Sequence, residues 1–221
     1  MLRLIATPLR TLAALAVLVV GPTLVQAAPA ELVLRSGSAL WLTGTSTIHD
    51  YRSQASRLEV AFTSDPTLWP AAASGVDAIE GLIRAQGVTA IDVVVDVAGL
   101  KSGKEGLDKN MYKALLAEKH PEIRFKVADY QVGAPGDTAG TRIDARGTLT
   151  VAGVEREITM SATARREGDT IRLRGSVPLL MTQFGIKPPK MMLGTIKTSD
   201  KVVVHIDLLI GAADGTAALS H

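Results

Sequence analysis

The chain has 221 residues, of which 47% are hydrophobic and 4% aromatic, and it contains no cysteine. This length suffices for one domain with a sizeable core, and the missing cysteines exclude disulfides, iron–sulfur clusters, thiolate zinc sites and cysteine nucleophiles. The 24 basic and 22 acidic residues nearly balance. We therefore predict no nucleic-acid partner, because that interaction depends on strong positive charge.

The first 27 residues are typical of a secretory signal peptide. Arg3 and Arg10 form its basic end, residues 12–20 form an unbroken apolar run, and small residues precede a cleavage site after Ala27. The apolar run is too short to span a membrane. The sequence thus predicts an exported bacterial protein, periplasmic or secreted, with no stable membrane span after cleavage.

Between residues 31 and 210 the dominant pattern is alternation of apolar and polar side chains, which is typical of antiparallel strands with one buried face. We predict a single domain over 31–210, with residues 211–221 as a flexible tail. Two less regular segments, 39–49 and 77–84, bring the expected number of strands to about eight or nine. The alternating segments are 59–62, 91–97, 123–127, 142–151, 157–165, 171–177 and 202–210.

Strands in this number either stack as a sandwich or close into a barrel. Closure removes both exposed edges, and glycines inside the strands permit sharp bends. These glycines are Gly44, Gly81, Gly147 and Gly175. We predict an all-β fold, namely an antiparallel closed β-barrel of about eight strands.

One segment, residues 107–119, lacks the alternation. Leu107, Met111 and Leu115 lie four residues apart and form the apolar stripe of an amphipathic helix. Pro121 is expected to end it, since the residue before a proline avoids the helical region. We predict one short α-helix that covers an open end of the barrel.

Catalytic and metal-binding patterns are weak in this sequence. The four histidines show no metal-ligand spacing, and neither a GxSxG elbow nor a phosphate-binding glycine loop occurs. His49 and Asp50 are an acid/base candidate, but neighbouring strand residues point to opposite faces, so we interpret His49 as a residue near the barrel rim and His205 as solvated. The prediction is a protein without catalytic residues, metal or cofactor.

The apolar faces of the strands would meet in the barrel interior. An eight-stranded barrel either packs solid or holds one narrow ligand, and the residues alone favour the packed interior. Interior positions include Val93, Val95, Leu173, Val204 and Ile206.

Four stretches, in order, resemble the YceI-like family. They are WLTGTSTIHD at 41–50, the helix and strand of 110–125, GTLTVAGVEREIT at 147–159, and FGI at 184–186 followed by the strand 200–208. The resemblance implies a lipocalin-like barrel that holds a polyisoprenoid or another long amphiphilic lipid in its lumen. It thereby favours a hollow interior over a packed one.

The resemblance also implies which residues contact the lipid. By position these are Phe125, Val127, Leu149, Ile158 and Met160 in the barrel, Met111, Tyr112 and Leu115 on the covering helix, and Phe184 near the mouth. Burying a methylene contributes about 0.8 kcal/mol and association costs at least about 4 kcal/mol. Micromolar binding, about 8 kcal/mol, then requires on the order of fifteen buried carbons, so prenyl or long acyl chains fit better than short fatty acids.

Alternatives stay open at this point. Lys187, Lys190 and Lys197 could meet an anionic headgroup, although a solvated basic loop is the simpler interpretation, and Met191 and Met192 suit an adaptable apolar lip. A packed barrel could act through its surface as a stress or interaction protein. A lipid-modifying enzyme could use His49 and Asp50. The sequence leaves lipid identity and homodimer formation undetermined.

Overall fold

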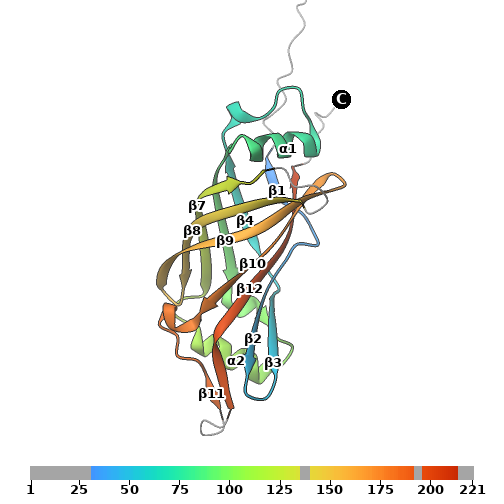
Figure 1. Ribbon diagram of the computed structural model, residues 1–221. Helices are drawn as coiled ribbons and strands as arrows, with labels where there is room; N and C mark the ends of the chain where they lie inside the picture. Colours follow the sequence, from blue (N-terminus) through green and yellow to red (C-terminus); the bar gives the residue numbers. More distant parts are fainter. Residues whose placement is uncertain (1–30, 135–139, 192–195, 214–221) are drawn as a thin grey trace, which may run out of the picture.

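The computed structural model describes residues 31–134, 140–191 and 196–213. In these residues an antiparallel sheet curls into a half-barrel, and two α-helices lie at its two ends (Figure 1). Ten strands follow one another through hydrogen bonds in the order β4-β5-β7-β8-β9-β10-β12-β2-β3-β6. Two short strands, β1 and β11, pair with β12 outside this order.

The strands have the following bounds. They are β1 (Leu32–Leu34), β2 (Ala39–Ser46), β3 (Asp50–Ala55), β4 (Glu59–Ser64), β5 (Val88–Asp96), β6 (Leu100–Lys101), β7 (Glu122–Val132), β8 (Thr141–Val151), β9 (Val154–Glu167), β10 (Thr170–Leu180), β11 (Lys190–Met191) and β12 (Ile196–Ala212). Short 3₁₀ helices are η1 (Pro66–Leu68), η2 (Val97–Gly99) and η3 (Met181–Phe184).

The predicted closed barrel of eight strands is wrong. The path of paired strands begins at β4 and ends at β6, and these two strands do not pair with each other. The long strand β12 pairs with β10 on one side and β2 on the other, it pairs with β1 and β11 near its two ends, and it has an irregularity between Thr198 and Val202. Strand β12 also continues through Gly211 and Ala212, two residues into the segment predicted as a tail. Residues 1–30 and 214–221, which include the predicted signal peptide, lie outside the described residues.

The alternation in the sequence is confirmed as a set of strands with one inner face. Val93 lies opposite Phe125, and Phe125 lies opposite Leu149, so three strands contribute one row of apolar side chains. A Cβ on Gly147 would lie 2.1 Å from the carbonyl oxygen of Lys126. Glycine at this position therefore permits the close approach of β7 and β8 beside the irregularity in β7.

Residues 77–84 form a helix rather than the predicted strand. Helix α1 (Gly75–Arg84) buries Val76, Ile79 and Leu82, whose spacing of three places them on one face of a helix but on alternating faces of a strand. Its place is fixed by Tyr130, whose hydroxyl donates to the Ile83 carbonyl at 3.2 Å and accepts from the Val88 N–H at 3.3 Å. Helix α1 covers the upper end of the half-barrel, and Gly81 is a helix residue.

The predicted amphipathic helix is confirmed at the lower end as α2 (Glu105–Ala114) (Figure 1). It ends earlier than predicted, because Leu115 is its C-cap and Leu116 adopts φ 55°. Pro121 therefore does not end it. Near its start, the Asp108 carboxylate accepts bonds from the Ser102 N–H at 2.8 Å and hydroxyl at 2.6 Å.

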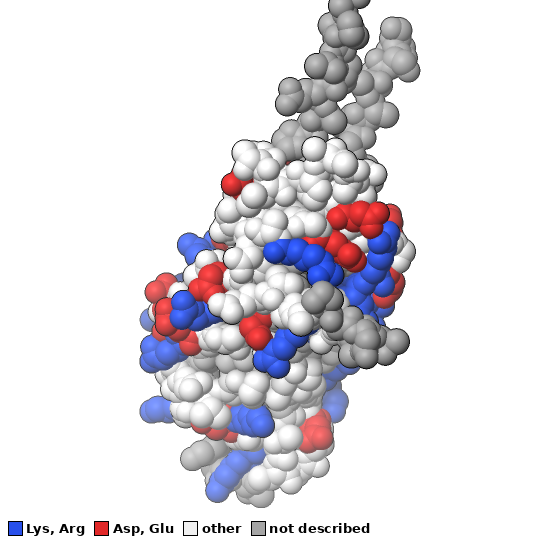
Figure 2. Space-filling view, turned by 45° about the horizontal axis from the view of Figure 1, so that its top comes forward, with Lys and Arg blue, Asp and Glu red and all other residues white. Residues whose placement is uncertain are grey.

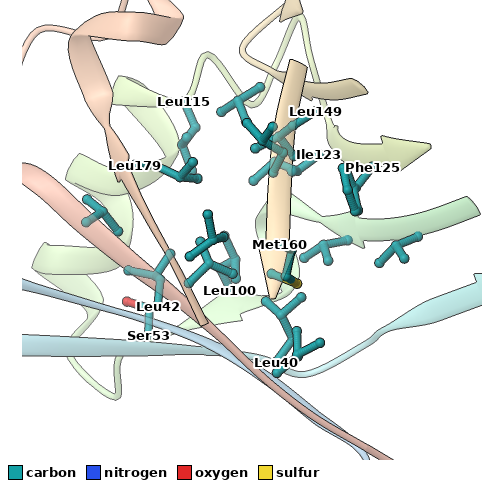
Figure 3. Close-up of a pocket in the computed structure, with 18 of the residues that line it drawn as sticks. Leu40, Leu42, Ser53, Leu100, Leu115, Ile123, Phe125, Leu149, Met160 and Leu179 are labelled. Carbon is teal, nitrogen blue, oxygen red and sulfur yellow. The ribbon is translucent and has the colours of Figure 1, made fainter. Parts of the chain in front are cut away.

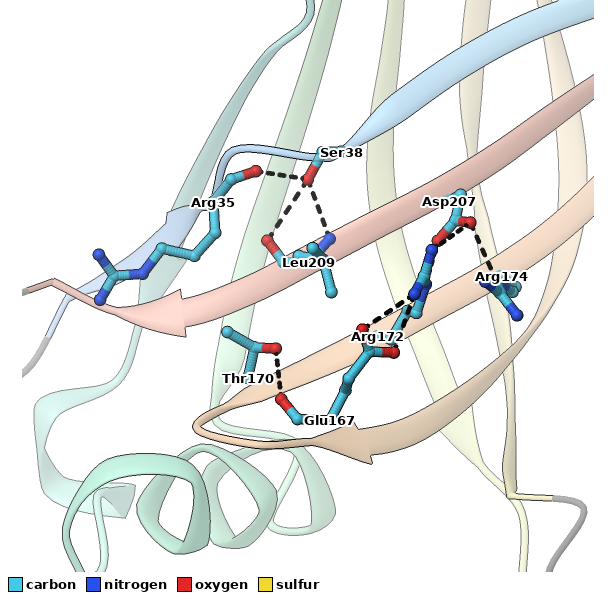
Figure 4. Close-up of polar contacts among 8 residues, drawn as sticks. All are labelled: Arg35, Ser38, Glu167, Thr170, Arg172, Arg174, Asp207 and Leu209. Atoms are coloured by element: carbon cyan, nitrogen blue, oxygen red, sulfur yellow. Dashed lines mark hydrogen bonds and ion pairs between the residues drawn. The ribbon is translucent and has the colours of Figure 1, made fainter.

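Polar contacts on the outer face hold β10 and β12 together (Figure 4). The Asp207 carboxylate accepts two bonds from Arg172, at 2.6 and 2.9 Å, and one from Arg174 at 3.0 Å. Arg172 also donates to Glu167 at 2.9 Å. The Arg172 guanidinium lowers the pKa of Asp207, with a smaller contribution from Arg174.

This pKa shift predicts a loss of stability in acid. A carboxyl with a lowered pKa in the folded state stabilises that state above its unfolded pKa, and the contribution disappears as pH falls through the folded value. We expect Asp207→Asn to reduce the free energy of unfolding by about 2 kcal/mol at neutral pH. Below about pH 4, the free energy of unfolding should fall less steeply with decreasing pH in this variant than in the unmodified protein. Urea unfolding at several pH values measures this. Asp169→Asn, on an exposed turn residue, is the control, and equal pH profiles for Asp207→Asn and the unmodified protein would contradict the assignment.

Candidate functional site: an apolar cavity

A cavity of about 290 Å³ lies inside the half-barrel (Figure 3). This volume is near the lower end of the range of small-molecule sites. Strands β2 to β10, strand β12, helix α2 and η3 all contribute to its wall. The interior is thus partly hollow. The alternation in the sequence alone was compatible with both a packed and a hollow interior.

Nearly all residues predicted to line the lumen lie on the wall of this cavity. The only exception among them is Tyr112. The lining residues are Val93, Val95, Met111, Leu115, Phe125, Val127, Leu149, Ile158, Met160, Leu173, Phe184, Val204 and Ile206. Their contact with a lipid stays a prediction.

Tyr112 points away from the cavity and anchors α2 to the sheet edge. Its hydroxyl lies 2.7 Å from the Leu100 carbonyl and 3.0 Å from the Ala98 carbonyl, and it accepts a bond from Lys101 Nζ at 2.9 Å. Asn110 and Met111 both line the cavity. Each further helix residue turns by about 100°, so Tyr112 lies about 200° round the helix from Asn110 and faces the sheet edge.

The sequence analysis missed the part of the wall formed by β2, β3 and their neighbours. Gly44 on β2 makes room for Tyr51, since a Cβ there would lie 2.3 Å from the tyrosine hydroxyl. The alternation of Leu40 and Leu42 could have revealed part of this wall, but the glycine and hydroxyl residues that follow obscure it. The missed lining residues include Leu40, Leu42, Tyr51, Ser53, Leu58 and Leu100.

None of the described residues that line the cavity is charged. Four of them carry a polar side chain, namely Tyr51, Ser53, Asn110 and Thr198. Burial raises the pKa of the Tyr51 hydroxyl, so it stays neutral. The Ser53 side chain is 1% exposed, and its hydroxyl has no hydrogen-bond partner within the described chain. Such a wall suits the hydrocarbon part of a ligand and disfavours a charged group.

The cavity reaches the surface at its lower end. Leu180 lines the cavity and is also 40% exposed, and Met181, next in the chain, lies on the wall as well. Pro189, Thr198 and Leu115 line the same region. At the upper end, by contrast, Ile79 and Leu82 of α1 are completely buried. We call the opening beside Leu180 the mouth.

Among the described residues, His49 and His205 do not line the cavity. His49 and Asp50 are exposed at the turn between β2 and β3 and are absent from the cavity wall. The prediction of a solvated His205 is wrong: its ring stacks on Trp41 with centroids 5.2 Å apart, and its Nε2 lies 3.0 Å from the Thr43 hydroxyl. This stack forms because Trp41 and His205 face each other across β2 and β12.

Metal ligands do not cluster in the part of the chain that the structure describes, since no group of three or more His, Asp or Glu side chains converges there. Across the same residues, no helix combines the length and apolar character needed to cross a membrane. Lys187 and Lys197 are exposed. The side chains of Lys190 and Met191, and all of Met192, lie outside what the structure describes.

Solved structures show the same fold at low sequence identity. BcnA of Burkholderia cenocepacia matches with a TM-score of 0.58 and 17% identity, over 78% of this chain and 95% of that one. A polyisoprenoid binding domain from Saccharophagus degradans matches with a TM-score of 0.57 and 14% identity, over 84% and 99%. The YceI protein of Campylobacter jejuni matches with a TM-score of 0.54 and 16% identity, over 76% and 88%.

A search of curated proteins finds no match. The sequence model of the YceI-like domain matches residues 43–210. This segment contains most of the half-barrel, helix α2 and the mouth of the cavity. The chain therefore belongs to the YceI-like domain family.

Proposed function

We propose that this protein is an exported carrier that holds a long-chain isoprenoid, or a similar amphiphilic lipid, in its cavity without transforming it. The observation that carries the proposal is the uncharged, apolar wall of the cavity, with an opening at one end. Family membership supports it, as does the similar fold of a polyisoprenoid binding domain. The expected signal peptide at residues 1–27 supports export.

The chemistry of the wall indicates how such a lipid would bind. Its affinity would come from burial of hydrocarbon, which requires on the order of fifteen carbons for micromolar binding. A charged headgroup finds no ionic partner among the described residues of the wall, so it would stay at the mouth. A slender prenyl or acyl chain therefore fits better than a bulky or charged molecule.

The cavity also favours binding over catalysis. A lipid-modifying enzyme needs an acid, base or nucleophile close to the bound chain, and His49 and Asp50 lie outside the wall. The alternative, a stress or interaction protein that acts through its surface, assumes a solidly packed barrel. This interior instead contains a cavity of about 290 Å³.

Native mass spectrometry of protein purified from its bacterial host tests the proposal. We expect a mass increment that corresponds to one lipid, that organic solvent removes, and that chromatography identifies as a long-chain isoprenoid or acyl lipid. The same spectrum reports export, since a processed chain would begin at Ala28. Protein that is repeatedly isolated empty, and that also fails to bind a long prenyl alcohol when lipid-free, would contradict the proposal.

A further inference from the structure

Exposed apolar side chains gather at the lower end of the molecule, around the mouth. Ile48 is 64% exposed, Leu116 48% and Leu180 40%. They belong to the turn between β2 and β3, the end of α2, and the end of β10, all of which lie at the lower end in Figure 1. We call the surface formed by these three residues the mouth face.

Contacts between these segments confirm that they are neighbours. The Thr47 N–H donates to the Lys197 carbonyl at 3.0 Å, which holds the turn of Ile48 against β12. Leu180 lies opposite Lys201 in the pairing of β10 with β12. Leu115, which precedes Leu116, packs in the same apolar cluster as residues of β10 and η3. The three residues of the mouth face thus lie on segments that meet near the opening of the cavity.

Basic side chains surround the mouth face. Within residues 47–50, 113–120, 180–187 and 197–201, five exposed lysines have no ion pair within the described chain: Lys113, Lys119, Lys187, Lys197 and Lys201. The same ranges contain three carboxylates, namely Asp50, Glu118 and Asp200.

The middle of the molecule is different. There, opposite charges are interspersed (Figure 2) and pair with each other, as Arg142 does with Asp144 at 2.8 Å and Arg146 with Asp129 at 3.0 Å. The unpaired cations are thus available to an external anionic partner.

We propose that the mouth face docks on a bilayer that contains anionic phospholipids, so that a lipid passes between membrane and cavity without crossing water. This rests on the proposed carrier function and adds the partner surface. Exposed leucine and isoleucine side chains insert at the boundary of headgroups and acyl chains, and surrounding lysines attract anionic headgroups. Leu180 belongs to both the mouth face and the cavity wall, which makes the path from bilayer to cavity continuous.

Co-sedimentation with vesicles tests the docking surface. The protein is mixed with vesicles of phosphatidylcholine alone or with 30% phosphatidylglycerol. We expect binding to the anionic vesicles only, with a loss in 0.5 M salt. The mouth variant Ile48→Ser/Lys119→Glu/Lys201→Glu is expected to bind at least about 25-fold more weakly, because each lysine near the membrane surface contributes about fivefold. None of these three side chains lines the cavity.

A variant at the other end of the molecule, with one charge reversal instead of two, is the control. Leu68→Ser/Arg84→Glu changes a residue that is 41% exposed and an exposed cation near α1, and it is expected to bind like the unmodified protein. If both variants lost vesicle binding equally, or if the mouth variant lost none, the proposed docking surface would be wrong.

Native mass spectrometry of the same samples separates the two proposals. If the protein carries lipid but does not bind anionic vesicles, the docking proposal is wrong and the carrier proposal stands. A protein that binds vesicles but never carries lipid refutes the carrier function and, with it, the transfer role of the mouth face.

Discussion

Replacement of Ala145 by tryptophan is expected to abolish lipid binding while the protein stays folded. Ala145 lies on the cavity wall in β8 and is only partly buried, so an indole can extend into the hollow interior. It would take the space of several methylenes of the lipid. Loss of four buried methylenes, at about 0.8 kcal/mol each, raises Kd about a hundredfold or more. Titration of lipid-free protein with a fluorescent long-chain isoprenoid analogue measures the change.

The control for this variant lies on the opposite face of the same strand. Thr148→Trp adds the same side chain to β8 at a position outside the cavity wall, and it is expected to leave Kd within about twofold of its original value. Circular dichroism and urea unfolding establish that both variants are folded. Unchanged affinity in a folded Ala145→Trp protein would show that the lipid binds elsewhere.

Leu82→Ala is expected to cause a large loss of stability, about 3 kcal/mol in the free energy of unfolding. The Leu82 side chain is completely buried between α1 and the sheet, in one cluster with Ile79, Val88 and Tyr130. Its removal leaves a cavity that the surrounding side chains fill only in part. Guanidinium unfolding followed by tryptophan fluorescence and circular dichroism measures the loss.

An exposed leucine near the same end provides the comparison. Leu68 is 41% exposed, so Leu68→Ala should change the free energy of unfolding by less than about 0.5 kcal/mol. Because the mouth lies at the opposite end of the half-barrel, folded Leu82→Ala protein should still bind lipid. A loss of less than about 1 kcal/mol in Leu82→Ala would mean that α1 is only loosely attached to the sheet.

The low charge of the cavity wall and the high charge of its surroundings have a common structural origin. Side chains alternate between the two faces of each strand. Val93, Phe125 and Leu149 point into the cavity, so the residues directly before and after each of them point outward. On that outer face Arg124 pairs with Asp92 at 2.7 Å across β7 and β5. A single alternating pattern thus supplies both a hydrocarbon-compatible interior and a surface on which charges pair.

The sequence by itself determined the all-β character, the inner face of most strands and the helix at the cavity mouth. These features are local: a period of two selects one face of a strand, and residues four apart select one face of a helix. Val93, Phe125 and Leu149 could therefore be assigned to the interior from their own segments, as could Met111 and Leu115.

Only the tertiary structure decided how the sheet ends, which residues complete the cavity and what surrounds its opening. The half-barrel depends on β12 pairing with four other strands, and hydrogen bonds between distant segments leave no local pattern. Residues 77–84 were predicted as a strand, but they belong to helix α1, whose buried face packs in one cluster with Tyr130. The placement of Ile48, Leu116 and Leu180 at the same end of the molecule follows from chain topology, because their segments come together only when the whole sheet has curled.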